Sequence, residues 1–92
     1  MNEKILESKV VQYCKENGLY CRKFASPAHR GVPDRLIVGK GVVMFLELKS
    51  AGKKPTALQL RELELIRHGG VSAIWTDSWE LAKREIDFQF GL

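Results

Sequence analysis

The spacing of apolar residues predicts three helices in this chain. Residues 2–17 form the first, where Asn2 can cap the start, and residues 56–68 form the second, with Thr56 as its cap. A third helix is expected from about residue 77 to about residue 86. The apolar stripe of the first segment repeats at helical spacing: Leu6, Val10, Tyr13 and Cys14.

Four other segments have the composition of strands. They cover residues 19–25, 34–38, 42–49 and 71–76. The second and third are joined by Gly39-Lys40-Gly41, a short turn typical of a hairpin. The order αβββαβα predicts an α/β fold with a mixed β-sheet flanked by helices. With 92 residues, the chain has the length of a single domain, residues 1–92.

The tail, residues 86–92, alternates apolar and polar residues, which is a strand pattern. Two interpretations are open. The tail either packs on the core of its own chain, or forms a dimer contact through an apolar edge.

Composition and charge narrow the class of protein. The net charge of +4 favours polyanion partners without requiring them, because a modestly basic chain is often only a soluble one. Cys14 and Cys21 lack metal-ligand spacing, which suggests buried thiols in a reducing compartment. The longest uncharged apolar run, residues 42–46, is too short to span a bilayer, and no phosphate-binding glycine loop is present. We expect a cytoplasmic protein with neither a membrane partner nor a nucleotide cofactor.

Two short motifs carry the clearest chemistry, Gly31-Val32-Pro33-Asp34 and Glu47-Leu48-Lys49. Strand side chains alternate between faces, so Glu47 and Lys49 should point the same way. The hairpin roughly pairs Asp34 with residues 46–48, and cross-strand neighbours lie about 4.5–5.5 Å apart. Adjacent carboxylates repel each other without a cation, and hard divalent ions prefer oxygen ligands. The motifs therefore predict a metal-dependent phosphodiesterase site, with the backbone carbonyl of Leu48 as a third ligand.

Three further residues have two interpretations each. Lys49 could orient and deprotonate the attacking water or stabilise developing charge, or it could be a solvated lysine paired with Glu47. Glu7 borders the buried stripe of the first helix, where it could support the site or bind a second metal ion, or instead pair with a neighbour through solvent. Gln59 lies three residues after Thr56, so a capping box is sufficient reason for it, and a role in holding water or phosphate is the alternative.

Several basic residues are close in sequence to the two acids. They are His29, Arg30, Arg35, Lys40, Lys53, Lys54 and Arg61. They predict a track for a phosphate backbone on loops around the site, although general solubility would also explain them. No helix rich in Arg, Asn and Gln is evident, so we expect recognition by backbone and shape, as suits a branched or bent duplex.

Together, Gly-x-Pro-Asp, the hairpin, Glu-x-Lys and a following helix with Gln resemble the PD-(D/E)xK nuclease superfamily and, within it, the VRR-NUC family. The resemblance implies a restriction-endonuclease-like core in which Asp34 and Glu47 bind Mg²⁺ or Mn²⁺ and Lys49 assists the attacking water. Glu7 matches the acidic residue of the family's first helix, and Gln59 the glutamine that supports the site. Stand-alone members are similar to Holliday junction resolvases and act as homodimers. We expect this chain to be encoded by a bacterium or a bacteriophage.

The resulting hypothesis is a metal-dependent, structure-selective DNA endonuclease that acts as a resolvase-like homodimer. A restriction or nicking enzyme acting on linear duplex is one alternative. The other is a non-catalytic DNA-binding module of the same fold.

Overall fold

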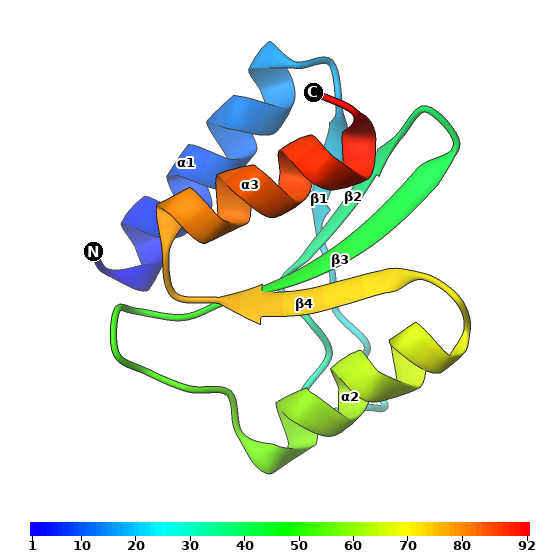
Figure 1. Cartoon of the computed structure of the whole chain (residues 1–92). Helices are drawn as coiled ribbons and strands as arrows, with labels where there is room; N and C mark the ends of the chain where they lie inside the picture. The colour runs from blue at the N-terminus through cyan, green and yellow to red at the C-terminus, as the bar shows by residue number, and fades with distance from the viewer.

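The computed structural model describes all 92 residues and contains a four-stranded sheet with helices on both faces (Figure 1). Its elements are α1 (Glu3–Glu16), β1 (Tyr20–Lys23), β2 (Arg35–Gly39), β3 (Val42–Leu48), α2 (Ala57–His68), β4 (Ser72–Thr76) and α3 (Trp79–Phe90). The predicted α/β fold with the order αβββαβα and a mixed sheet is confirmed.

The strands follow the chain in the order β1-β2-β3-β4. β1, β2 and β3 are antiparallel neighbours, whereas β4 runs parallel to β3. A parallel neighbour requires a crossover connection, and α2 provides it. The β2–β3 hairpin turns through Lys40 and Gly41, which both have positive φ, as a two-residue hairpin turn requires.

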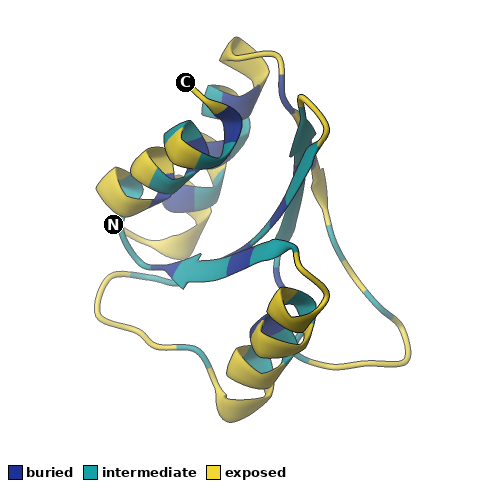
Figure 2. Ribbon diagram, turned by 45° about the vertical axis from the view of Figure 1, so that its right-hand side comes forward, coloured by how far each residue is buried: buried dark blue, intermediate teal, exposed yellow.

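The main core lies between the sheet and the pair formed by α1 and α3, and α2 packs against β4 on the opposite face (Figures 1 and 2). Alternate residues of β3 supply Met44, Leu46 and Leu48 to this core. Cys14 and Cys21 are buried in it as free thiols, as expected. None of the helices has the length and apolar character needed to cross a membrane.

Side-chain caps begin all three helices. Asn2 accepts a hydrogen bond from the N–H of Ile5, and Ser78 accepts one from Leu81. Thr56 and Gln59 form the predicted capping box at the start of α2. These caps satisfy backbone donors that the first turn of a helix leaves unpaired.

The predicted strand at residues 86–92 is wrong, because α3 continues to Phe90 and ends at Gly91 in the left-handed conformation. Ile86 and Phe90 alternate with polar residues, but they are also spaced four apart and continue a buried stripe that begins at Ala82. The hydroxyl of Tyr13 donates to Asp87, which ties this turn to α1. The side of the tail that carries Ile86 and Phe90 therefore packs on its own core, as a helix, whereas Phe88 is exposed.

Candidate functional site

Glu47 is a buried carboxylate near the end of the apolar strand β3, only 2% exposed. Its Oε2 lies 3.4 Å from Nζ of Lys49, while Oε1 is buried without any hydrogen-bond partner. Burial first, and the nearby charge of Asp34 second, raise the pKa of Glu47 to about 7, and Lys49 opposes this shift. An unpaired buried carboxylate oxygen is costly, so this atom marks a position that a ligand could satisfy.

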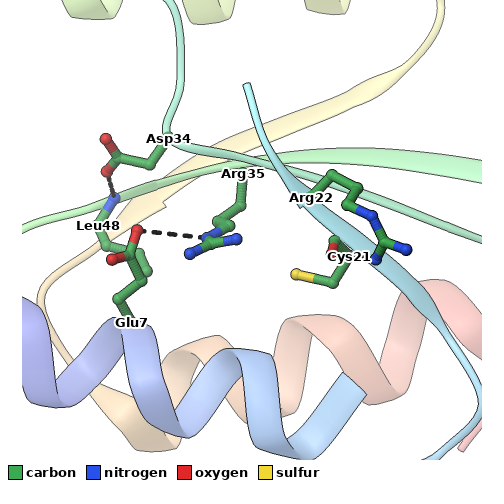
Figure 3. A network of polar contacts seen from close by, with 6 residues as sticks. All are labelled: Glu7, Cys21, Arg22, Asp34, Arg35 and Leu48. Atoms are coloured by element: carbon green, nitrogen blue, oxygen red, sulfur yellow. Dashed lines mark hydrogen bonds and ion pairs between the residues drawn. The ribbon is translucent and has the colours of Figure 1, made fainter. Parts of the chain in front are cut away.

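Asp34 comes directly before β2 and lies across the ladder from Glu47. Arg35 pairs with Leu46, so one further step along this antiparallel register places Asp34 opposite Glu47. The Oδ2 atom of Asp34 accepts a hydrogen bond of 2.9 Å from the N–H of Leu48 (Figure 3). The structure therefore brings Asp34, Glu47 and Lys49 together.

The loop that delivers Asp34 packs closely on the first turn of α2. Gly31 has φ +83°, and a Cβ added there would lie 3.0 Å from the backbone carbon of Leu58 and 3.1 Å from the nitrogen of Gln59. A residue with a side chain would meet both strain and collision at this position. Pro33 is fully buried and orients the entry into β2. The N-terminus of α2 therefore borders the site.

The side chain of Gln59 is part of the capping box at the start of α2. Its Oε1 accepts from the N–H of Thr56 at 2.9 Å, and no hydrogen bond joins it to Asp34 or Glu47. The capping interpretation is sufficient for the geometry, and a role in the site stays a prediction.

Glu7 does not contact the two central acids. Its Oε2 lies 3.3 Å from Nε of Arg35, in a half-buried ion pair on the α1 side of the sheet. In Figure 3, Glu7 rises from α1 towards Arg35 and Leu48. The interpretation that it pairs with a neighbour is the one that this geometry favours, although the partner is Arg35 and not a residue reached through solvent.

Comparison with known proteins places this chain and its fold in a family. Over 83 residues, 89% of each chain, the sequence is 39% identical to "Putative nuclease p44" of Acyrthosiphon pisum secondary endosymbiont phage 1. A solved structure described as "VRR_NUC domain" superposes with a TM-score of 0.86 and 27% identity, covering 96% of this chain and 97% of that one. The chain belongs to the VRR-NUC family. No family model matches the sequence.

In this VRR-NUC chain, three basic residues do not lie on the loops that flank the acids, so their predicted placement there is wrong. Lys40 is in the β2–β3 turn, about 20 Å along β3 from Glu47, and its Nζ donates to the carbonyl of Phe90. Arg35 lies in β2 and is paired with Glu7. Closeness in sequence was a poor guide for Lys40, because the turn of the β2–β3 hairpin lies at the opposite end of these strands from Asp34 and Glu47. Arg61 is exposed but lies within α2 and not on a loop. The remaining predicted basic residues are exposed on the flanking loops: His29, Arg30, Lys53 and Lys54.

Two residues beside the VRR-NUC site were not predicted. Trp75 of β4 is the parallel partner of Glu47. Glu3 adds a small upward contribution to the pKa of Glu47, and its N–H donates to Oγ of Ser50 at 3.2 Å, so the start of α1 meets the segment after Lys49. No local pattern reports either contact, because each depends on how distant elements pack.

The donor set of the VRR-NUC site fits a hard cation. Nowhere in the chain do three or more His, Cys, Asp or Glu side chains gather as a metal cluster. An ion bound beside Glu47 would therefore have the carboxylates of Asp34 and Glu47 and the backbone as its protein ligands. Two neighbouring carboxylates, one with an orphaned buried oxygen, suit an oxygen-binding ion that keeps water ligands, as Mg²⁺ does. The peptide of Leu48 lies beside Asp34, so its carbonyl stays a predicted third ligand.

Proposed function

We propose that this chain is a Mg²⁺- or Mn²⁺-dependent DNA endonuclease that is selective for branched structure and acts as a homodimer. The observation that carries the proposal is the buried, unpartnered Oε1 of Glu47 beside Asp34 and Lys49. The phage relative is named as a nuclease. The two motifs on which the family resemblance rests include all three residues.

The roles follow from the chemistry of phosphodiester hydrolysis. Asp34 and Glu47 would hold the cation, which supplies charge neutralisation and an acidified water when bound. The N–H of Leu48 fixes one oxygen of Asp34, so this carboxylate is positioned before any ion arrives. The ammonium of Lys49 would hold the attacking water and stabilise negative charge on the phosphate oxygens.

The substrate class follows from charge and shape. Exposed basic residues lie on the loop before Asp34 and on the loop after Lys49, on either side of the site in sequence. Cationic loops that flank a cleavage site suit contacts to phosphates, which carry no base information. Two sites related by a two-fold axis would suit a junction with two equivalent strands.

Three isosteric or near-isosteric variants test the site: Asp34→Asn, Glu47→Gln and Lys49→Met. In Asp34→Asn the amide keeps an oxygen that can accept from the N–H of Leu48, so folding is preserved while the charge is removed. We expect each variant to lose at least about a hundredfold in the rate of cleavage of a four-way junction, with Mg²⁺ or Mn²⁺ required throughout. Circular dichroism checks folding, and Glu64→Gln, an exposed carboxylate on α2, is the matched control.

The same assay decides between the alternatives. Wild-type turnover by the Asp34 variant, or full activity in EDTA, would overturn the metal assignment. Sequence-dependent cutting of linear duplex, with junctions left intact, would overturn the structural selectivity. Binding without cleavage of any substrate would support the non-catalytic module instead.

A further inference from the structure

The outer side of α3 carries two apolar residues, Leu81 and Phe88, that the fold does not cover. We define the α3 stripe as Leu81, Arg84, Glu85 and Phe88. Phe88 is 79% exposed, the highest value among the large hydrophobic residues, and Leu81 is 41% exposed. Figure 2 shows the outward side of this helix as exposed.

The α3 stripe faces away from the core. At 100° per residue, Ala82, Ile86 and Phe90 define the buried side of the helix, and Leu81 and Phe88 fall opposite them. The seven-residue separation of Leu81 and Phe88 is the spacing of a helix–helix seam, in which two apolar positions recur on one line. Single exposed apolar residues are common, but an aligned pair on the outermost line of a helix suggests a partner helix.

Charge and symmetry indicate what that partner is. If a second α3 lies antiparallel about a two-fold axis between positions 84 and 85, Leu81 faces Phe88 of the other copy. The same operation places Arg84 opposite Glu85 in both directions. Neither charge forms an ion pair within its own chain. The α3 stripe has no net charge, so it is less suited to a polyanion than the basic loops at the site.

We propose that the α3 stripe is the contact surface between two copies of this chain, packed as an antiparallel, two-fold symmetric helix pair. This inference rests on the proposed function, because it locates the interface of the homodimer proposed there. The dimer can nevertheless be measured without any nuclease assay. A 12-residue helix is about 18 Å long, so the contact is at the small end of specific interfaces. We therefore expect self-association with a Kd of roughly 10 µM.

Sedimentation equilibrium of the full chain, from about 1 to about 200 µM, tests this. The wild type should pass from monomer to dimer across the range. Phe88→Ser should stay monomeric, whereas Leu65→Ser, which changes a comparably exposed leucine on α2, should behave as the wild type. Circular dichroism confirms that each variant is folded.

A charge-swap cycle gives the sharper result. Arg84→Glu places like charges opposite each other at both ends of the contact, and so does Glu85→Arg, so each single variant should weaken the dimer at least about tenfold. The double variant R84E/E85R recreates the opposed pairs and should restore the wild-type Kd. A loss of folding could not be rescued in this way.

Several outcomes would overturn the proposal. They are a monomer at every concentration, a dimer insensitive to Phe88→Ser, a dimer broken by Leu65→Ser instead, or failure of the double variant to recover. The junction-cleavage assay is read separately. A dimer without activity would therefore count against the nuclease activity alone. An active monomer would count against this interface and the proposed homodimer, but not against the nuclease activity.

Discussion

Glu47 is held in an environment that disfavours its charge. Its side chain is buried, and its Oε1 atom has no hydrogen-bond partner. Burial and the nearby carboxylate of Asp34 both raise its pKa. The ammonium of Lys49 lowers the pKa of Glu47, but this only partly offsets the upward shift. The carboxylate of Glu47 is therefore exposed to electrostatic repulsion that a bound divalent ion would relieve. Perturbed pKa values of this kind are common where a protein uses a carboxylate for chemistry.

The raised pKa of Glu47 makes stability depend on pH. Between its ordinary value of 4.5 and the folded value of about 7, the folded state binds more protons than the unfolded state. The contribution of this group to the free energy of unfolding therefore falls as pH rises through that window, and is constant above it. Glu47→Gln removes the penalty, so it should stabilise the protein at pH 8 by up to about 3 kcal/mol and change little near pH 4.5.

Urea denaturation at these two pH values, in EDTA, measures this difference. Glu64→Gln serves as the control, because that side chain is exposed. A Glu47→Gln variant that is no more stable than the wild type at pH 8 would show that the carboxylate is not destabilised by its surroundings.

At this scale the central residues were predictable and their surroundings were not. Alternation along β3 and the position of the hairpin suffice to place Asp34, Glu47 and Lys49 together. The Glu7–Arg35 pair joins α1 to a strand 28 residues away, and an amphipathic pattern says which side of a helix is buried but not which residue it meets.

At the scale of elements, the loop before β2 depends on the first turn of α2. Gly31 and Gly52 offer a matched comparison, since both have φ +83° but only Gly31 lies against another backbone. We expect Gly52→Ala to cost about 1 kcal/mol from backbone strain alone. Gly31→Ala should cost a further 1–3 kcal/mol or so, because the added Cβ has no room.

Thermal or urea unfolding of the two variants measures the difference in stability cost. Junction cleavage by the Gly31 variant shows whether a displacement of the loop also moves Asp34. Equal costs at the two glycines would mean that the loop moves freely away from α2. The position of Gly31 in a turn was readable from sequence, but its contact with Leu58 and Gln59 was not, because it depends on where α2 crosses the sheet.

The helices show which local signals were decisive. Side-chain caps at Asn2 and Thr56 located two helix starts within a residue. The end of α3 was misjudged because Ile86, Phe88 and Phe90 fit a two-residue period, whereas the buried set Ala82, Ile86 and Phe90 fits a helical one. A short segment can satisfy both periods, and packing against α1 decides between them.

At the scale of the whole molecule, positive charge is divided between two ends of the sheet. Lys53 and Lys54 follow the strand that carries Glu47, while Lys40 lies at the opposite end of that strand. If DNA runs past the site, the two groups should contribute differently to binding.

The salt dependence of junction binding tests that division. Lys53→Ala and Lys54→Ala should each reduce the slope of log Kd against log salt by about one, because each removes one cation that neutralises a phosphate. Lys40→Ala should leave the slope unchanged and reduce stability by at most about 1 kcal/mol, through its hydrogen bond to Phe90. An equal effect on the slope at Lys40 would mean that DNA covers the far end of the sheet as well.

The pairing of α1 with α3 also has a consequence for synthesis of the protein. Leu6 and Val10 share one core cluster with Ile86 and Phe90, although about 80 residues separate them. A ribosome must release the chain as far as Phe90 before this cluster can close, so folding is completed only after translation has passed that residue. Until then the nascent segment offers an open apolar surface to chaperones.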